Sequence, residues 1–315
     1  MIGLKVTRYS PDLSSAWNEF VARAKNGLFL FDRGYMDYHA DRFVDHSLLV
    51  WNADTLVALL PANERDGRLV SHGGLTFGGL LSDRRMRAVT MLEVFSALRA
   101  YLAAQGLDGL TYKAIPHIYH QVPAEEDLYA LQVNGARLAR RDVSSTIDLR
   151  DRVTYAKGRK WSTSRALAAG LEVAEGRGFA EFMALEAAHL LQKYGVRPTH
   201  TAEEMELLAA RFPDAIRLFT ARRDGELLGG VLIYESPMVA HAQYIAGSEA
   251  GREVGALDAI LHHLLNTVFA GRRPFFDFGI STEEAGMRLN AGLIENKESY
   301  GARATVHDFY ELDPA

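Results

Sequence analysis

The sequence contains no cysteine among its 315 residues. This absence excludes a disulfide framework, a thiolate metal site and a cysteine nucleophile, so a covalent mechanism would have to use another residue. Long hydrophobic runs are also missing: no stretch of about 18 apolar residues occurs, and no membrane-spanning helix is predicted. Residues 1–10 lack the apolar segment of a secretory signal, and we therefore expect a cytoplasmic protein.

Positive charge is scarcer than negative charge, with 35 Lys and Arg residues against 40 Asp and Glu residues. Proteins that bind nucleic acids usually carry a basic face, so this balance argues against a nucleic-acid partner. The length favours two domains, because one domain typically has about 100–200 residues. A hydrophobic fraction of 48% supplies ample core for both, and we expect a monomer or a homodimer.

The most informative feature that is present is an internal repeat. Each half of the chain follows the same order of a hairpin, a third strand, an amphipathic helix, a strand, a helix and a last strand. The expected hairpins span 47–60 and 217–234, and the third strands span 68–72 and 238–246. The two amphipathic helices carry apolar residues at i, i+4, i+7 and i+11. These residues are Met91, Phe95, Leu98 and Leu102 in one half, and Leu257, Leu261, Leu264 and Val268 in the other.

The two halves also close alike. Strands are expected at 109–115 and 274–280, and a Gly-Ala-Arg step at 135–137 and 301–303 leads from a helix end into the last strand. The matched order of elements indicates a duplication with a boundary near Asp151. We therefore predict domains at 1–150 and 151–315, the second opening with helices at 178–194 and 201–212.

This order of elements resembles the GNAT acyltransferase domain, and two such domains in one chain resemble the FemAB-like group. The most telling segments are Phe276-Asp277-Phe278-Gly279 and the helix end at 296–301, which reads Asn-Lys-Glu-Ser-Tyr-Gly. The resemblance covers nearly the whole chain. It implies an α/β (α+β) fold of two tandem GNAT-like domains, each a mixed, mostly antiparallel sheet flanked by helices, with the active site in a cleft.

In the first half, residues 29–43, 61–63 and 71–79 resemble a subgroup associated with bacterial surface-polysaccharide pathways. This resemblance implies N-acylation of a nucleotide-linked amino sugar from acetyl-coenzyme A or a longer acyl-coenzyme A, without a metal. The chain departs from the group in two respects. It shows no long coiled-coil arm, and residues 251–256 match the coenzyme A loop of the single-domain family only loosely.

The expected cofactor site lies before the helix stripe that begins at Leu257. A helix N-terminus presents free N–H groups to a pyrophosphate, and glycines allow close approach. The predicted cofactor-binding residues are Gly251, Arg252, Val254, Gly255, Ala256 and, from the resemblance, Lys297. The alternatives are an ordinary strand-to-helix turn for 251–256 and a solvated last-turn cation for Lys297.

Three residues are candidates for the chemistry of acyl transfer. His241 and Asp277 are candidate general bases, because histidine and carboxylates fill that role most often. Tyr244 is a candidate donor to the leaving thiolate or to a sugar hydroxyl. Each also has a structural alternative: a histidine within a strand, a carboxylate that caps a helix or pairs with arginine, and a half-buried strand aromatic.

The expected substrate site draws on polar and aromatic residues of the first half and on the basic stretch after residue 151. Its predicted members are Tyr35, Tyr38, His39, Arg42, His72, Gly73, Gly74, Thr76 and Lys160. The alternatives are an amphipathic helix, a plain connecting loop and a charged linker. His117 and His120 have no third ligand with recognisable spacing, so no metal site is predicted.

Two other functions compete with the first. Aminoacyl transfer from a charged tRNA would need an extended basic surface, against which the acidic balance counts. A non-catalytic double-domain protein that only binds a ligand is the third possibility, kept open by the loose match at 251–256.

Overall fold

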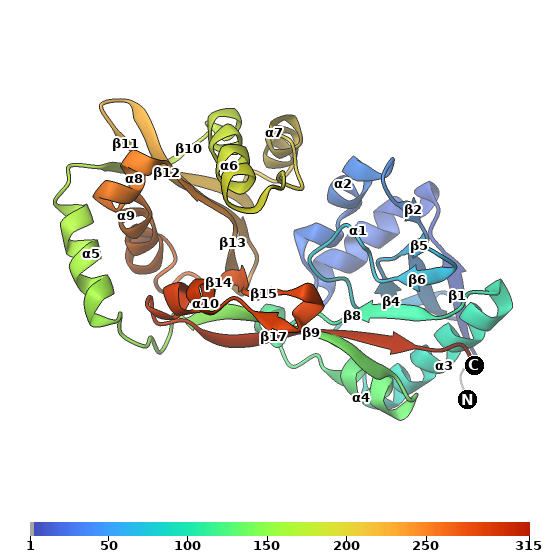
Figure 1. The fold of residues 1–315 in the computed structure, drawn as a ribbon. Helices are drawn as coiled ribbons and strands as arrows, with labels where there is room; N and C mark the ends of the chain where they lie inside the picture. The colour runs from blue at the N-terminus through green and yellow to red at the C-terminus, as the bar shows by residue number, and fades with distance from the viewer. Residues whose placement is uncertain (1–2) are drawn as a thin grey trace. The chain divides into compact units, whose positions relative to one another are not determined.

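The computed structural model describes residues 3–315 and divides into two compact units (Figure 1). Unit 1 comprises 1–143, 282–288 and 306–315, and unit 2 comprises 144–281 and 289–305. These bounds differ from the contiguous halves 1–150 and 151–315, which remain a prediction about the repeat. Within residues 3–315, none of the helices has the length and apolar character needed to cross a bilayer.

Unit 1 contains two groups of strands. One is antiparallel, in the order β1 (Leu4–Arg8), β3 (Leu48–Asn52), β4 (Thr55–Leu60), β7 (Leu81–Ser82). The other has the order β17 (Arg303–Leu312), β8 (Leu110–Lys113), β6 (Arg68–Val70), β5 (Asn63–Arg65), β2 (Val44–Asp45). Its α-helices are α1 (Ser14–Arg23), α2 (Arg33–Met36), α3 (Ala88–Gln105) and α4 (Glu126–Val133). The predicted apolar stripe of α3 is confirmed, because Met91, Phe95, Leu98 and Leu102 are all buried in the core.

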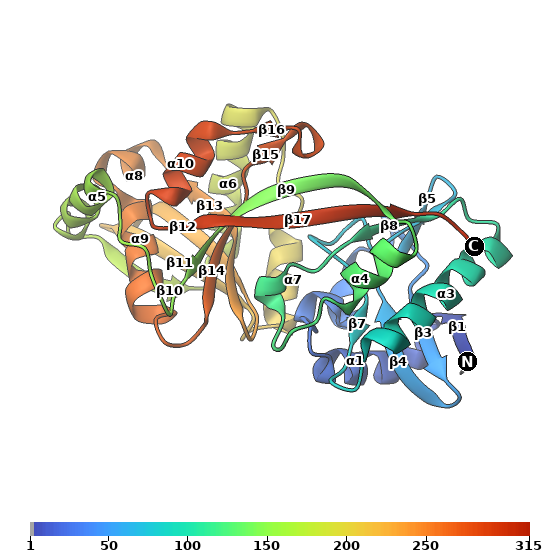
Figure 2. The ribbon, with the colours of Figure 1, turned by 90° about the horizontal axis from the view of Figure 1, so that it is seen from below.

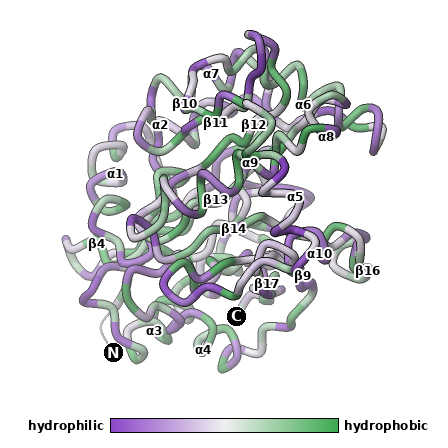
Figure 3. Tube along the Cα trace, turned by 90° about the vertical axis from the view of Figure 1, so that its left-hand side faces the viewer, coloured by the Kyte–Doolittle hydropathy of each residue, from purple (hydrophilic) through white to green (hydrophobic). Residues whose placement is uncertain are grey.

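Unit 2 contains the strand order β10 (Glu172–Gly176), β11 (Ile216–Arg223), β12 (Glu226–Glu235), β13 (Val239–Gly247), β14 (Phe275–Ile280), β9 (Arg137–Asp148). Its helices are α5 (Lys157–Leu167), α6 (Phe179–Tyr194), α7 (Ala202–Arg211), α8 (Glu249–Val254), α9 (Ala256–His263) and α10 (Ala291–Glu298). A π-helical turn, Leu264–Val268, continues α9, so the second apolar stripe crosses from α9 into this turn. Figure 3 shows the hydrophobic residues along β12, which form the core of this unit with α9.

The capping of α7 follows directly from its sequence. The Thr201 side chain accepts from the backbone N–H of Glu204, and the Glu204 carboxylate accepts from the backbone N–H of Thr201. This reciprocal pair satisfies two N–H groups that would otherwise have no partner at the start of the helix. The N-terminus of this helix was therefore readable from the Thr-x-x-Glu pattern.

The last strand of each half pairs with a strand from the other half of the sequence. In unit 2, β14 pairs antiparallel with β9, with Phe276 opposite Ile147 and Asp277 opposite Thr146. In unit 1, β8 pairs antiparallel with β17, with Tyr112 opposite Tyr310. Figure 2 shows β9 and β17 as long neighbouring strands, each of which contributes residues to both units.

Candidate active site

The site is built where two parallel strands of unit 2 separate. The pairing of β13 with β14 is short: Val239 faces Phe275, Ala240 faces Phe276, and His241 faces Asp277. After His241, β12 is the only described strand that still pairs with β13. The later part of β13, residues 242–247, therefore presents unpaired backbone donors and acceptors along one edge.

The last residue pair before the strands part is a hydrogen-bonded histidine and carboxylate. His241 Nδ1 lies 2.7 Å from Asp277 Oδ2. The Asp277 side chain is fully buried, and its Oδ1 accepts from Ser144 Oγ at 2.6 Å and from Thr146 Oγ1 at 2.9 Å. An ionised Asp277 accepts the Nδ1–H of His241, which leaves Nε2 as the basic nitrogen of the ring. The two predicted catalytic residues are thus brought together in a proton-accepting arrangement.

Lys297, on α10, lies near enough to Asp277 for the carboxylate to act on its pKa. It is 7% exposed, and its Nζ donates to Gly279 O and Ile280 O at 2.8 Å and to Ser281 Oγ at 2.9 Å. An ammonium group has three donors, and these contacts use all of them. Burial lowers the pKa of Lys297 to about 8, against the opposing effect of the nearby Asp277. The position favours a role in holding the end of β14 near Asp277 over direct contact with a cofactor.

Tyr244 faces the same side of the sheet as His241 because β13 contains a bulge. Tyr244 pairs with Leu232 and Ala242 pairs with Ile233, so Gln243 is the extra residue. A bulge of this kind shifts the alternation of side chains by one residue. Ala242 belongs to the core beneath α9, so Tyr244 and His241 share the opposite face. The Tyr244 hydroxyl lies 2.7 Å from His200 Nδ1, and burial raises its pKa.

The predicted cofactor loop has a different local structure from the one expected. Residues 249–254 form α8, capped by Ser248, whose side chain accepts from the N–H of Gly251. A Cβ at Gly251 would lie 1.9 Å from Leu228 O, so close packing rather than phosphate approach accounts for this glycine. Val254 is partly buried against the core.

The cofactor prediction depended on a helix N-terminus without a side-chain cap, and the start of α9 has this property. Gly255 has a φ of +76° and leads directly into Ala256, and no side chain caps α9 there. Arg165 donates to Glu253 O at 3.2 Å, and Arg252 Nη1 donates to Gly247 O at 3.4 Å. Arg165 therefore lies near the turn into α9, where Gly255 packs against Ala166 of α5. Lys160 is exposed on α5, the helix that packs on α9.

The predicted substrate residues of the first half gather in one cluster in unit 1. The ring of Tyr38 lies 5.4 Å from that of Tyr35 and 4.3 Å from that of His39, and His39 lies 5.3 Å from His72. Arg42 is exposed above Tyr38, with its guanidinium 5.4 Å from the ring. The sequence spacing therefore identified a real aromatic cluster. Three of its members, Tyr35, His39 and His72, are buried.

The glycine-rich segment of unit 1 packs against this cluster. A Cβ at Gly74 would lie 2.4 Å from His39 Nε2, and one at Gly73 would lie 3.3 Å from the ring of Phe43. His72 has a φ of +43°, and burial with the nearby charges of His39 and Lys113 lowers its pKa to about 3. Thr76 is exposed. Internal packing therefore explains Gly74, while Thr76 remains open to a ligand.

The two units can be compared at the place where their parallel strands separate. In unit 1, β6 and β8 pair in parallel through Leu69–Leu110 and Val70–Thr111. When the pair Val70–Thr111 is aligned with the pair Val239–Phe275, His72 corresponds to His241 and Lys113 corresponds to Asp277. Lys113 Nζ donates to the carbonyl of His72 at 3.0 Å, and its own carbonyl accepts from Gly79 N at 2.8 Å. The glycine-rich segment thus bonds to the end of β8, the counterpart of β14.

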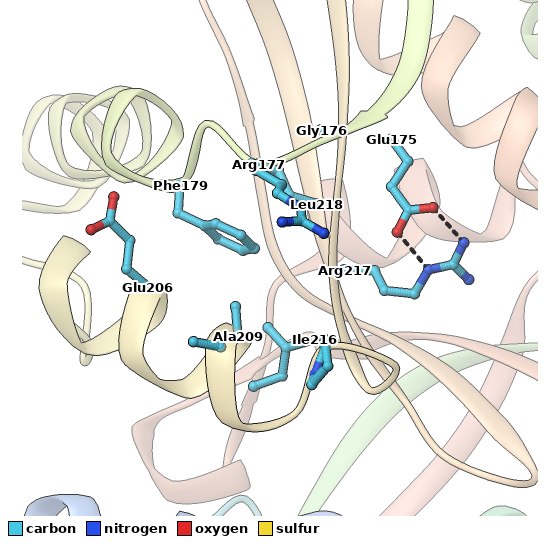
Figure 4. Close-up of a pocket in the computed structure, with 11 residues that line it drawn as sticks. Glu175, Gly176, Arg177, Phe179, Glu206, Ala209, Ile216, Arg217 and Leu218 are labelled. Atoms are coloured by element: carbon cyan, nitrogen blue, oxygen red, sulfur yellow. Dashed lines mark hydrogen bonds and ion pairs between the residues drawn. The ribbon is translucent and has the colours of Figure 1, made fainter.

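A surface pocket of about 480 Å³ lies elsewhere in unit 2, between β10, β11, α6 and α7 (Figure 4). Phe179, Ala209 and Ile216 form its apolar wall, and neither His241 nor Asp277 lines it. Its Arg217 is already neutralised by Glu175 at 2.7 Å and by Glu235 at 2.8 Å. This pocket is therefore not part of the candidate active site.

Four polar residues around the site were missed by sequence reasoning: Ser144, Thr146, Glu186 and His200. Ser144 and Thr146 alternate on β9 just before Ile147, so their period of two placed them on one face. Their hydrogen bonds to Asp277, more than 130 positions away in the chain, depend on the pairing of β9 with β14. Glu186 is a single carboxylate on the buried face of α6, and the sequence alone does not distinguish it from a surface residue.

Residues 150–285 match the family model described as Acetyltransferase (GNAT) domain. FemX has a similar structure, with a TM-score of 0.67 at 10% identity over 96% of each chain. L-PGS from Bacillus licheniformis gives 0.61 at 13% identity over 97% of this chain and 92% of that one. A tandem GNAT protein from the clavulanic acid biosynthesis pathway gives 0.52 at 13% identity over 99% and 98%. No curated protein matches the chain in sequence.

These similarities confirm the predicted fold class, a mixed α/β architecture of two tandem repeats. The family match contains the whole of β13 and β14, and hence the His241–Asp277 pair.

Proposed function

We propose that this chain, whose residues 150–285 match the GNAT acetyltransferase family model, is an acyltransferase. In this proposal, unit 2 transfers an acyl group from acyl-coenzyme A to the amine of a nucleotide-linked amino sugar in surface-polysaccharide biosynthesis. The observation that carries this proposal is the His241–Asp277 pair, 2.7 Å apart, at the open edge of β13. A binding module without catalysis has no need of a histidine whose carboxylate partner is fully buried.

The open edge of β13 suits the amide-bearing arm of coenzyme A. An extended ligand with amide groups can pair with an unpaired strand edge as an added strand does. Backbone N–H groups on the same edge would stabilise the oxyanion that develops on the thioester carbonyl. The first N–H groups of α9, together with Arg165 and Arg252, supply a site for the phosphates. These features support binding of acyl-coenzyme A in unit 2.

The side chains at the place where β13 and β14 separate supply the proton transfers. His241 Nε2 accepts a proton from the amine as it attacks, and Asp277 stabilises the imidazolium that forms. The C–N bond forms and the C–S bond breaks, with the proton ending on the sulfur. Tyr244, whose hydroxyl stays protonated because burial raises its pKa, is placed on the same face to donate to the leaving thiolate. No covalent enzyme intermediate is required, in agreement with the absence of cysteine.

The acceptor side of the proposal depends on the resemblance of the first half. Tyr35, Tyr38, His39 and Arg42 with His72 form an aromatic and polar cluster in unit 1 that suits a nucleotide or sugar. Thr76, exposed in unit 1, would add a hydroxyl to this cluster. Lys160, exposed on α5 of unit 2, would separately offer a cation for phosphates. Gly73 and Gly74 would shape the wall of this site.

A screen of ligand-induced thermal stabilisation tests the proposal. Acetyl-coenzyme A, longer acyl-coenzyme A esters, nucleotide diphosphosugars and bulk tRNA are compared on the full chain. A ligand that binds only the folded state at a hundredfold excess over its Kd stabilises by about 2.7 kcal/mol. We expect shifts with a coenzyme A ester and with a nucleotide sugar, followed by release of free thiol when both are present. Stabilisation by tRNA with none by coenzyme A would overturn the proposal.

Aminoacyl transfer from tRNA is the second candidate function. It rests on the resemblance of the sequence to the FemAB-like group, with whose member FemX the chain shares its fold over 96% of both chains. On the basic helix α5, Arg159 is already paired with Asp258 at 2.6 Å, which weakens its attraction for an RNA phosphate. The tRNA arm of the same screen separates the two candidates.

A further inference from the structure

A buried carboxyl group on α6 has no part in the chemistry described above. Glu186 is 4% exposed and lies on the helix face that also buries Phe182 and Met183. Among the residues that the structure describes, none donates a hydrogen bond to Glu186 Oε2. Burial alone raises the pKa of Glu186 to about 7, with no basic side chain acting against it. The group is therefore held without a cation where a hydrophobic side chain would ordinarily pack.

Glu186 faces the part of β13 that follows His241. Helix α6 packs against β12 and β13, and it comes so close to β12 that a Cβ at Gly230 would lie 2.5 Å from the ring of Phe182. The charge of Glu186 contributes to the raised pKa of Tyr244, whose hydroxyl also interacts with Gln243. The carboxyl group thus lies near the bulge of β13, on the face shared by Tyr244 and His241.

Gln243 supplies a second acceptor of the same kind. It is the extra residue of the bulge, and its Oε1 is buried without a donor among the described residues. A buried acceptor with no partner costs about 1–3 kcal/mol, so two such oxygens beside one tyrosine call for a donor group. A carboxylate and an amide oxygen accept hydrogen bonds, and an ammonium group offers three N–H donors with a compensating charge. A hydroxyl group offers one donor and no charge.

We infer that Glu186 and Gln243 bind the ammonium form of the acceptor amine, and that Glu186 takes its first proton. This inference rests on the proposed function. The ammonium gives one proton to the Glu186 carboxylate and becomes the neutral amine that attacks the thioester. The second proton leaves the nitrogen through His241 as the C–N bond forms, and it ends on the thiol of coenzyme A. Glu186 then releases its proton to solvent, which completes the balance.

Calorimetric titration of the full chain at pH 7.5 tests this inference. The probes are coenzyme A first, then UDP-glucosamine and UDP-glucose as an amine and hydroxyl pair on the coenzyme A-saturated protein. The variants are Glu186→Gln, which keeps the shape, Glu186→Asp, which withdraws the charge by one methylene, and Glu181→Gln. Glu181 lies on the same helix, is exposed and pairs with Arg222, so it is the matched control.

We expect the wild type and Glu181→Gln to prefer the amine over the hydroxyl compound by at least tenfold. Glu186→Gln should reduce this preference below twofold while its Kd for coenzyme A stays unchanged, which also shows that it folds. Glu186→Asp should give an intermediate preference. A wild type without preference for the amine, or a preference that survives in Glu186→Gln, overturns the inference and leaves coenzyme A binding intact. Failure of the wild type to bind coenzyme A overturns the proposed function instead.

Discussion

Replacing Glu186 by glutamine should change how the stability of the protein depends on pH. Burial raises the pKa of Glu186 from 4.5 to about 7 in the folded protein. Between these values the unfolded chain has lost the proton and the folded chain has kept it. The free energy of unfolding therefore falls as pH rises from 4.5 to 7, and above pH 7 the contribution of Glu186 to it no longer changes. Glutamine does not titrate, so the variant lacks this loss.

The size of the effect follows from the difference of 2.5 between the two pKa values. At about 1.36 kcal/mol per unit, the variant should gain about 3 kcal/mol relative to the wild type between pH 4.5 and 7.5. The amide group adds its own cost, but that cost is the same at every pH. Urea unfolding at pH 5, 6, 7 and 8 measures the difference, which corresponds to a relative shift of about 1–2 M in the midpoint. Glu181→Gln serves as the exposed control on α6.

A difference between Glu186→Gln and the wild type that is constant from pH 5 to pH 8 would refute this reasoning. Such a result would mean that Glu186 is solvated or paired in solution. It would also remove one support of the amine site, because a solvated carboxylate needs no ligand to satisfy it.

Three further substitutions test the site and its support. Asp277→Asn removes the charge that orients His241, so it should lower kcat, measured by thiol release, by about 10²–10⁴-fold. The control Asp148→Asn, at a surface ion pair with Arg150, should keep kcat near the wild-type value, and equal rates for both variants would exclude Asp277 from catalysis. Lys297→Met leaves the carbonyls of Gly279 and Ile280 without their donor and should cost about 2–4 kcal/mol in urea unfolding, so an unchanged midpoint would contradict its role in holding β14. Gly251→Ala should destabilise the protein by more than about 2 kcal/mol, because its Cβ would meet Leu228 O. The control Gly292→Ala on α10, with open space around it, should stabilise the protein by about 0.5–1 kcal/mol, and the opposite order of melting temperatures would refute the packing explanation.

Local patterns predicted the elements of this protein well. The strand expected at 55–60 is β4, and the apolar stripe from Met91 to Leu102 is the buried face of α3. Such patterns repeat within one element, so a short window of sequence contains them. The bounds of the helices at 178–194 and 201–212 agree with α6 and α7 to within one residue at each end.

The site was predictable only in part, for a different physical reason. His241 and Asp277 were identified separately from their strands, but their hydrogen bond depends on the register between β13 and β14. The donors that orient Asp277 come from β9, through a pairing that no local pattern encodes. Glu186 escaped notice because a single carboxylate on an apolar helix face looks like an ordinary surface residue until the face is known to be buried. The segment expected to be a cofactor-binding loop is helical instead, because Ser248 caps a further helix there.

The last strand of each half pairs with a strand of the other half, and this pairing constrains the order in which the protein can fold during synthesis. Unit 1 needs β17, which begins at Arg303, to cover β8 at Leu110–Lys113. During synthesis, β8 must therefore wait with one edge uncovered until nearly the whole chain has left the ribosome. Pairings between such distant segments form slowly, because the entropy of closing a long loop is lost before the contacts are gained. A cut at residue 150 would separate β9 from its partner β14 and β17 from its partner β8, so we expect that neither fragment would fold alone.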